Sequence, residues 1–336
     1  MVTPIAPAAV APRPASVSVL VTAYNAAATI GDAVRTALAE PEVAEVIVVD
    51  DASQDATLAA ARASAPDDPR LKLIRCPQNG GPAAARNRAL DEATGRFVAI
   101  LDADDFVMAG RFARLLAVPD WDMVADNILF VPESADPDHL PPVPAVSHAD
   151  VIDLDLVDFV RANRSARTGP RDEWGFLKPV IRRDMLQRLD LRYDPGLRLG
   201  EDYDLYVRLL QQGARFRVSP QVGYAARWRD NSLSASHRTE DLAALTRAAT
   251  AHLAAAGLSG AARTALVAHR RDLQNRFLLR DFLDRRGRRG RIGAVLDTFR
   301  RPTTLLPIAR GILRDKLAAR RSHAPATRIG HLLIER

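Results

Sequence analysis

Short apolar runs alternate with helical stretches along the first third of the chain. The apolar runs cover residues 17–21, 45–49, 71–74 and 97–101, and after the first of them Ile30, Val34 and Leu38 recur at helical spacing. Continuous apolar runs, as opposed to alternating ones, are typical of strands that helices cover on both faces. The pattern predicts a β-α-β-α-β-α-β order with a parallel sheet, and therefore an α/β domain.

Several element boundaries can also be predicted. Asp55 is expected to be the N-cap of the second helix, and Pro82 lies in the first turn of the third. Beyond residue 120, residues 121–131 are expected to form another strand, and 132–150 a long loop or lid. Residues 197–213 predict an amphipathic helix that ends at Gly213, and 214–218 and 222–228 predict a closing pair of strands.

Polar residues follow each of the four predicted strands. They occupy positions 22–25, 50–53, 78–81 and 102–105. In open α/β sheets, ligands bind beyond the carboxyl ends of the strands. The sequence therefore predicts a binding site at this edge of the sheet.

The last of these segments brings two carboxylates together. In an extended chain residues i and i+2 share a face, so Asp102 and Asp104 can point at one ligand while Ala103 packs behind them. Burying two like charges is unfavourable unless a positive group lies between them, and Mn²⁺ or Mg²⁺ fits that need. The alternative is a solvated acidic turn before the next helix. Asp105 is expected to cap that helix, around Phe112.

Asp50 and Asp51 form a second acidic pair at a strand end. One of them is expected to accept hydrogen bonds from a base or a sugar hydroxyl, while the other caps the next helix. Gly80 and Gly81 precede a helix, which permits an anion to approach the backbone closely, although they also fit a simple turn. Neither G-x-x-x-x-G-K-S/T nor G-x-G-x-x-G occurs in this region, so P-loop and Rossmann sites lose their main support.

A further acidic segment, residues 200–204, begins the amphipathic helix. A single carboxylate held there over a pocket would serve as a general base. The alternative is that these acidic side chains only stabilise the first turn through the helix dipole.

Together these segments resemble the nucleotide-sugar-dependent glycosyltransferases of family 2. The resemblance covers residues 16–234 and rests on VSVLVTAYNAAATIGDAVRTAL, VIVVDDASQDAT, NGGPAAARNRAL, GRFVAILDADD and GEDYDLYVRL, which follow the family's order. It is similar in particular to bacterial exopolysaccharide enzymes of the succinoglycan type. The resemblance implies a GT-A fold, with a mixed, mainly parallel sheet and helices on both faces. It also implies an inverting transfer from a nucleotide-sugar, with a UDP-sugar as the expected donor, to a hydroxyl of a glycan or lipid-linked oligosaccharide.

The resemblance assigns roles to individual residues. Asp202 corresponds to the catalytic base, Asp102 and Asp104 to the ligands of a divalent cation (Mn²⁺ or Mg²⁺), and Glu201 to an acceptor-side residue. The nucleoside would contact Thr22, Tyr24, Asn25, Asp50, Asp51, Arg86 and Asp102. Trp174 could stack on an acceptor sugar, although a core position fits it equally well.

The chain departs from the family pattern at three positions. Thr22 stands where relatives often have Pro, Ala52 where Gly is usual, and Arg229 where many members have His. The last change removes a third metal ligand from the pattern. We expect Arg227 or Arg229 to neutralise the donor diphosphate instead, because guanidinium groups suit phosphate oxygens.

The C-terminal part is strongly basic. Residues 261–336 hold 19 Lys and Arg against 6 Asp and Glu, a net charge of +13, which leaves −7 for residues 1–260. The mixture of Arg clusters and apolar residues in 280–321 fits an amphipathic, peripheral contact with an anionic membrane surface. A solvated helical hairpin packed on the catalytic domain is the alternative. No nucleic-acid recognition motif accompanies the arginines, so nucleic acid is not an expected partner.

Length and composition indicate the class of protein and its division into domains. With 336 residues, 47% of them hydrophobic and 26% charged, the chain is ordinary for a soluble protein of two structural units. We divide it into a flexible Ala/Pro tail (1–15), a GT-A catalytic domain (16–235) and a basic helical region (236–336). The single Cys76 can form no internal disulfide, and no apolar run approaches about 20 residues, so a cytoplasmic protein is expected.

Other functions remain open at this point. A sugar nucleotidyltransferase shares the fold style but usually carries a Gly-rich, Lys-containing N-terminal loop that this chain lacks. A non-catalytic glycan-binding or scaffold protein would need neither the metal carboxylates nor the base. The sequence does not reveal the donor sugar or the acceptor hydroxyl, and it leaves open a homodimer.

Overall fold

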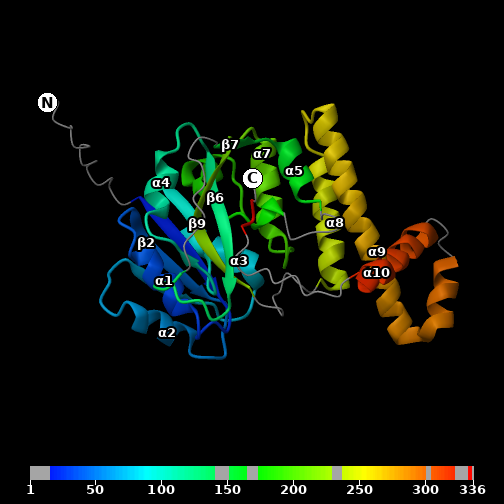
Figure 1. Cartoon of the computed structure of the whole chain (residues 1–336), viewed down its shortest axis with the longest axis horizontal. Coiled ribbons are helices and arrows are strands. Elements are labelled where there is room, and N and C mark those ends of the chain that lie inside the picture. Colours follow the sequence, from blue (N-terminus) through cyan, green and yellow to red (C-terminus); the bar gives the residue numbers. More distant parts are fainter. Residues whose placement is uncertain are drawn as a thin grey trace.

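The four predicted strands form the parallel part of a nine-stranded mixed sheet (Figure 1). The computed structural model describes residues 16–140, 151–164, 173–228, 237–299, 304–321 and 332–334. The predicted N-terminal tail lies outside this part of the chain. The strands are β1 (Val17–Ala23), β2 (Val43–Asp50), β3 (Leu71–Arg75), β4 (Phe97–Asp102), β5 (Phe106–Val107), β6 (Met123–Pro132), β7 (Ile152–Leu154), β8 (Val180–Arg182) and β9 (Phe216–Trp228).

The strand order explains why the sheet is mixed. It runs β3-β2-β1-β4-β8-β6-β9-β5, and β7 also pairs with β9. Strands β1 to β4 are parallel to one another, and β6 is parallel to β9. Strand β8 runs antiparallel to both β4 and β6, and β5 and β7 run antiparallel to β9. The predicted GT-A type of sheet is confirmed, and the predicted closing pair is corrected to the single long strand β9.

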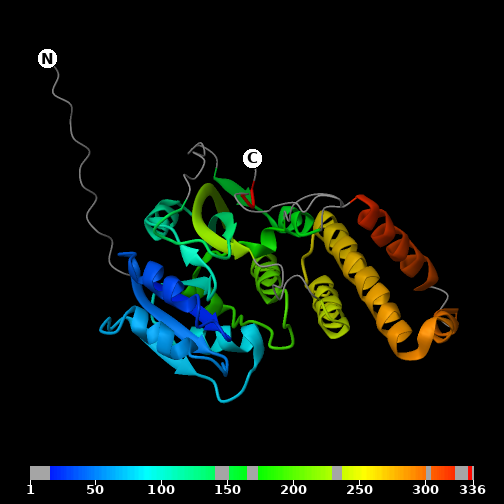
Figure 2. The ribbon, with the colours of Figure 1, turned by 60° about the horizontal axis from the view of Figure 1, so that its bottom comes forward.

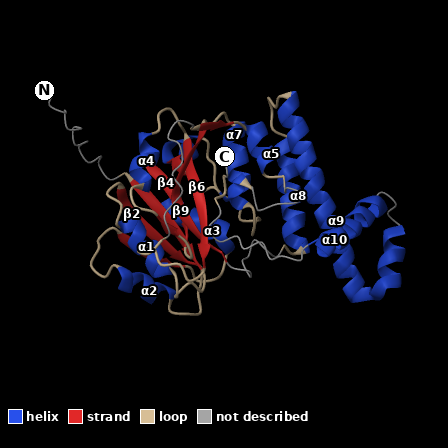
Figure 3. Cartoon of the chain, in the orientation of Figure 1, coloured by secondary structure: helices blue, strands red, loops and turns tan. Residues whose placement is uncertain are grey.

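Helices lie on both sides of this sheet (Figure 3). Those of the first part are α1 (Ile30–Leu38), α2 (Thr57–Ser64), α3 (Gly81–Glu92), α4 (Arg111–Ala117), α5 (Leu156–Ala162), the 3-10 helix η1 (Trp174–Phe176), α6 (Arg183–Arg188) and α7 (Glu201–Gln211). The basic region contains α8 (Thr239–Leu253), α9 (Gly260–Phe299) and α10 (Leu305–Arg321).

Two predicted helix caps are corrected. Asp55 precedes the N-cap position of α2, which Ala56 occupies, although its carboxylate still accepts a hydrogen bond from the Thr57 amide at 3.0 Å. Asp105 does not cap α4. Glu40, from the loop after α1, accepts hydrogen bonds from the amides of Gly110 at 2.7 Å and Phe112 at 3.1 Å instead.

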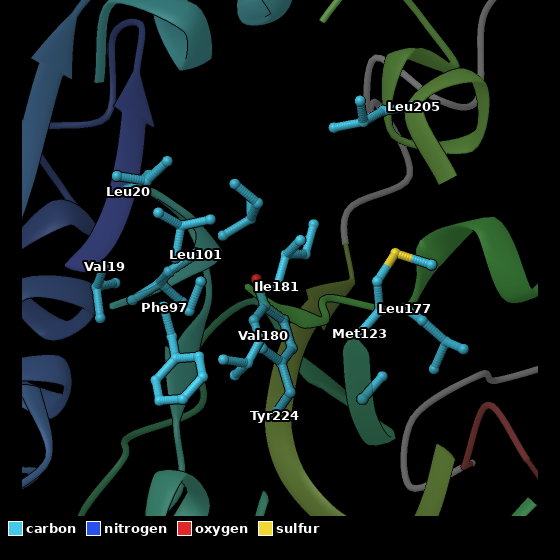
Figure 4. Close-up of a cluster of buried hydrophobic side chains, with 14 of the residues drawn as sticks. Val19, Leu20, Phe97, Leu101, Met123, Leu177, Val180, Ile181, Leu205 and Tyr224 are labelled. Carbon is cyan, nitrogen blue, oxygen red and sulfur yellow. The ribbon is translucent and has the colours of Figure 1, made fainter. Parts of the chain in front are cut away.

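The apolar strand residues form the main core between the sheet and the helices. Figure 4 shows part of it, with Leu20 of β1, Leu101 of β4, Ile181 of β8 and Met123 of β6 in one cluster. Each of these side chains is at most 2% exposed. Full burial of such a side chain contributes about 1.5–3 kcal/mol, so the sheet is a firm support for the loops at its edge.

Glu45 fastens β2 to its neighbours inside this frame. Its carboxylate accepts hydrogen bonds from the Ser18 hydroxyl at 2.6 Å and the Thr94 amide at 2.6 Å, and it pairs with the Lys72 ammonium at 2.5 Å. Burial raises the pKa of Glu45, but these donors outweigh it and lower the pKa to about 2. The ionised carboxylate is therefore an integral part of the fold.

The C-terminal helices extend from one side of the sheet (Figures 1 and 2). Helix α9 packs on α5 and α8, its course breaks at Gly290, where φ is 72° and ψ 173°, and α10 packs back on it. Residues 332–334 then lie against β6, where the buried Asn127 amide donates to the Ile334 carbonyl at 2.8 Å and accepts from its N–H at 2.9 Å. This contact ties the basic region to the sheet at a second point.

Candidate active site

The carboxyl ends of the parallel strands meet at one edge, as the pattern predicted. In the strand register, Thr22 of β1 pairs with Asp102 of β4, and Ala23 pairs with Asp50 of β2. Tyr24 follows with half of its surface exposed, at 50%. Asn25 has a φ of 52° and accepts a hydrogen bond from the Gln54 amide at 2.8 Å, which joins the first two strand ends.

Asp50 and Asp51 organise the turn after β2. The Asp50 carboxylate accepts a hydrogen bond from the Ser53 amide at 2.9 Å. The two oxygens of Asp51 accept the amides of Gly80 and Gly81, each at 2.8 Å. Asp51 thus holds the glycine turn at the start of α3 against the end of β2, and its role toward a nucleoside stays a prediction.

Arg86 of α3 joins three carboxylates that come from distant parts of the chain. Its guanidinium lies 3.1 Å from Asp102 and 3.4 Å from Asp202, and it donates a hydrogen bond to Glu201. The Arg86 side chain is buried and packs over the Tyr193 ring, 5.5 Å from its centroid. The Asp102 of β4 and the acidic start of α7 are therefore parts of one site.

Lys178, just before β8, is the second cation of this site. Its ammonium lies 2.8 Å from Asp102 and 3.1 Å from Asp202. We call Arg86, Lys178, Asp102, Glu201 and Asp202 the charged cluster. Three carboxylates and two cations leave it with one excess negative charge when all are ionised.

The protonation states of the cluster follow from its mutual contacts. Burial raises the pKa of Asp102, but the charges of Lys178 and Arg86 outweigh it and lower the pKa to about 2. Burial lowers the pKa of Arg86 and of Lys178, and the neighbouring carboxylates raise both well above their usual range. Burial raises the pKa of Glu201, an effect that Arg86 opposes. Both cations are charged at neutral pH.

A buried ion pair contacts the backbone of Lys178. The Arg111 side chain, at the start of α4, is fully buried and donates to the Asp126 carboxylate of β6 at 2.9 Å and to the Lys178 carbonyl at 2.6 Å. Gly223 makes room for this pair, since a Cβ there would lie 1.9 Å from an Asp126 oxygen.

Asp104 and Asp105 lie beside the charged cluster. Asp105 is buried and accepts hydrogen bonds from the Tyr224 hydroxyl at 2.8 Å and from the Arg227 amide at 2.9 Å. Burial and the negative charges of Asp104 and Asp102 raise the pKa of Asp105 well above its usual range.

The charged cluster has one excess negative charge, and the Asp104 carboxylate adds another beside it. This negative charge fits a divalent cation bound by the predicted ligands Asp104 and Asp102. Within the described part of the chain, no group of three or more His, Cys, Asp or Glu side chains forms a metal cage. A cation held here would need further ligands from beyond these described side chains, and phosphate oxygens commonly supply them to Mg²⁺ and Mn²⁺.

The remaining predicted residues have other neighbours. The Arg227 guanidinium pairs with Asp32 at 2.5 Å and donates to the carbonyls of Asp104 at 3.1 Å and Ala135 at 2.8 Å. It thus supports the loop that carries Asp104, and its contact with a diphosphate stays a prediction. Trp174 is partly buried and packs against the main core. Arg229 lies outside the described residues.

Lys178 and Arg111 were missed by the sequence analysis. Lys178 stands in the apolar segment FLKPVI, and Arg111 is followed directly by Phe112. A cation flanked by core residues is a signal that it is buried and paired, because unpaired burial of a charge is costly. The spacing of residues along the sequence does not indicate which carboxylates pair with these two cations.

Comparisons with known proteins agree with this geometry. The model of the family described as "Glycosyl transferase family 2" matches residues 18–178. Over 312 residues the chain is 44% identical to the succinoglycan biosynthesis protein ExoU of Rhizobium meliloti (strain 1021), covering 91% of this chain and 89% of that protein. It is also 35% identical to the succinoglycan biosynthesis protein ExoO of the same organism, with 91% and 88% covered.

Solved structures with the same fold are more distant in sequence. Residues 1–349 of S. aureus TarS in complex with UDP-GlcNAc align with a TM-score of 0.55 at 22% identity, over 81% of this chain and 74% of that one. The mannosyltransferase PcManGT from Pyrobaculum calidifontis, in complex with GDP-Man and Mn²⁺, aligns with a TM-score of 0.53 at 20% identity, over 91% and 86%. At this level of identity the likeness shows the fold.

Proposed function

The chain belongs to glycosyltransferase family 2, and from this premise we propose that it inverts the anomeric carbon of a nucleotide-sugar as it transfers the sugar. The observation that carries the proposal is the charged cluster. It unites Asp102, at the end of β4, with Asp202, at the start of α7, through Arg86 and Lys178. A donor-side carboxylate and a candidate base are thereby held next to each other.

Asp202 is the proposed general base. One of its oxygens accepts the Lys178 ammonium, and the other, Oδ1, is buried and makes no hydrogen bond. In the proposed reaction this oxygen takes the proton of an acceptor hydroxyl while the hydroxyl oxygen attacks the anomeric carbon. The bond from the anomeric carbon to the nucleoside diphosphate breaks with its electron pair on the diphosphate. A single displacement of this kind inverts the configuration.

Asp104 and Asp102 are the proposed ligands of a divalent cation. Such an ion, when bound, neutralises charge on the departing diphosphate. The protein's own contribution is a fixed carboxylate set, since the Asp102 amide donates to the Tyr224 hydroxyl at 3.1 Å and Arg227 donates to the Asp104 carbonyl at 3.1 Å. The Mn²⁺ in the PcManGT complex supports the presence of a divalent cation.

We propose a UDP-sugar as donor and a glycan or lipid-linked oligosaccharide as acceptor, in exopolysaccharide biosynthesis. The succinoglycan biosynthesis proteins ExoU and ExoO support the pathway class, and the UDP-GlcNAc complex of TarS supports the donor class. Tyr24, with 50% of its surface exposed beside the strand ends, is open to a nucleoside base.

The test combines donor binding with transfer. A thermal-shift panel of UDP-, GDP- and dTDP-sugars, with and without Mn²⁺, should single out a UDP-sugar that stabilises the protein more when the ion is present. The variant Asp202→Asn should keep that shift and lose transfer by about 100-fold or more, because a general base contributes about 10²–10⁴-fold. Undiminished product from this variant would remove the base assignment, and a panel without any response would remove the donor class.

We also propose that α10 attaches the protein peripherally to an anionic membrane surface at the cytoplasmic face. Helix α10 packs on α9 through Ile308, whereas Leu306 and Leu313 are 56% and 59% exposed and lie seven positions apart, on one face. Exposed arginines, among them Arg286 and Arg310, add the positive charge that anionic lipids attract. Among the described residues, no helix combines the length and the apolar character that crossing a bilayer requires.

Sedimentation with vesicles tests this attachment. The wild-type protein should sediment with vesicles that contain phosphatidylglycerol and stay in solution with pure phosphatidylcholine. Replacing both exposed leucines of α10 by Ser should weaken the binding. Val267 of α9 is 42% exposed, and Val267→Ser is the matched control that should leave it intact. Equal binding of the leucine variant and the control would refute a role for α10.

A further inference from the structure

The Lys178 ammonium connects two carboxylates of the proposed active site, Asp102 and Asp202. We propose that Lys178 is a positioning residue, which orients Asp202 so that Oδ1 receives the proton of the acceptor and which fixes this base relative to Asp102. The inference rests on the proposed function, because it takes Asp202 as the base. It adds a residue to the site that no sequence motif supplied.

The contacts of Lys178 divide the Asp202 carboxylate into two unlike oxygens. The Lys178 ammonium donates to Oδ2 at 3.1 Å. Oδ1 lies 3.4 Å from the Arg86 guanidinium but makes no hydrogen bond. A buried carboxylate oxygen without a donor is unusual, because buried polar atoms are normally satisfied. Oδ1 is therefore the oxygen that can accept an incoming hydroxyl proton while Oδ2 stays anchored.

The same ammonium reaches the donor side. It lies 2.8 Å from Asp102, so one atom of Lys178 bridges β4 and α7. An ammonium carries three donors that can point in separate directions, whereas a guanidinium offers a planar fork. The chain has 3 Lys and 44 Arg, and one of the three lysines stands where two carboxylates of different elements must be bridged. This choice of side chain matches a bridging role.

The backbone of Lys178 is also held firmly. Its carbonyl accepts the buried Arg111 guanidinium at 2.6 Å, and Pro179 follows it and restricts its conformation. The Lys178 residue is only 6% exposed. For folding alone, an apolar side chain would avoid the desolvation of an ammonium group. A charged side chain kept at this position, on a rigid backbone, is what a preorganised base requires.

Transfer kinetics of the full chain test the role. We compare the wild type with Lys178→Met and with Lys72→Met, which removes an ion pair to Glu45 remote from the site and serves as the matched control. In Lys178→Met, kcat should fall by about 100-fold with the acceptor KM changed only a few-fold, since misplacing a reacting group costs about that much. Lys72→Met should keep the wild-type kcat at a temperature below its melting point.

A double-mutant cycle separates positioning from general damage. If Lys178 acts through Asp202, adding Lys178→Met to Asp202→Asn should lower kcat by less than 3-fold further, because the base is already gone. A merely structural role would give the same loss in both backgrounds. Lys178→Gln, which keeps an N–H donor and removes the charge, replaces the Met variant in the cycle if the latter does not fold.

Two outcomes would overturn the inference while leaving the proposed function intact. One is a wild-type kcat in Lys178→Met. The other is an additive cycle. Absence of transfer by the wild-type protein with every donor of the panel would instead count against the proposed function itself.

Discussion

Replacing Asp126 with Asn leaves Arg111 as a fully buried cation without its charged partner. The Arg111 side chain has no exposed surface and the Asp126 side chain only 4%. Breaking a buried pair from one side typically costs about 3–5 kcal/mol, because the remaining charge keeps its desolvation cost and loses its partner. For a chain of this size that corresponds to a fall of about 4–7 °C in melting temperature.

The assay is urea unfolding of the wild type, Asp126→Asn, Arg111→Met and the double variant. The double variant should lose less than the sum of the single losses, by about 2 kcal/mol, because it buries no unpaired charge. Part of its loss should persist, since the Lys178 carbonyl no longer receives the Arg111 donor. A loss below about 1 kcal/mol in Asp126→Asn would refute the reasoning, because a buried pair cannot be broken so cheaply.

Three further predictions concern stability. Ala52 has a φ of 62°, a conformation that costs a non-glycine residue about 1–2 kcal/mol, so Ala52→Gly should raise the free energy of unfolding in urea by about 0.5–1 kcal/mol; an unchanged or lower value would contradict this. The folded pKa of Glu45, about 2, lies below the ordinary 4.5, so its contribution is present above pH 4.5 and is lost as the pH falls from there to 2. Glu45→Gln should therefore lower the free energy of unfolding by about 2 kcal/mol at pH 7, and the stability of the variant should fall less steeply below pH 4.5 than that of the wild type; an equally steep fall would contradict this. Burial, aided by the charge of His252, lowers the pKa of His269 from 6.5 to about 4, so stability should fall as the pH drops through that interval. The free energy of unfolding in urea should fall by about 2 kcal/mol between pH 7 and pH 5, and His269→Phe, which keeps a ring against Tyr203, should abolish this fall; a fall that persists in the variant would come from another group.

The sequence predicted the parallel half of the sheet well because burial on both faces leaves a local signature. Strands β1 and β2 are almost wholly buried, and their apolar runs are continuous. Strand β9 lacked such a signature, and it contains Pro220, which cannot donate to a sheet ladder. The pairing of β6 with β9 shifts register at this proline. Ala125 pairs with Val218, whereas Asn127, the second residue after Ala125, pairs with Val222. Strand β9 therefore continues past the register shift, and only its pairing with β6 shows that it is one strand.

The sequence indicated the carboxylates of the charged cluster and Arg86 as site residues, but it did not indicate Lys178 or the pairing of the two cations with these carboxylates. Asp102 stands at a strand end and Asp202 at a helix start, where local geometry indicates which way they face. The extended arrangement expected for Asp102 and Asp104 is wrong, because β4 ends at Asp102 and Asp104 lies in the turn that the Asp105 amide closes on the Asp102 carbonyl at 3.1 Å. The cations that neutralise Asp102 and Asp202 arrive from elsewhere: Arg86 across 16 positions from Asp102, and Lys178 across 24 positions from Asp202. No helical or strand spacing encodes such distances.

The flanks of the buried cations nevertheless carry usable information. Arg86 follows the run Ala83–Ala84–Ala85, Lys178 follows Leu177, and Arg111 precedes Phe112. Small or apolar neighbours place a charged side chain against the core, and a charge against the core must find a partner or coordinate an ion. Arg111 pairs with Asp126 outside this cluster, so the neighbours of a cation in the sequence indicate that it is buried and paired but do not select its partner. Charge balance restricts the partners to carboxylates that are themselves buried, and the choice of Asp202 for Lys178 comes from the structure.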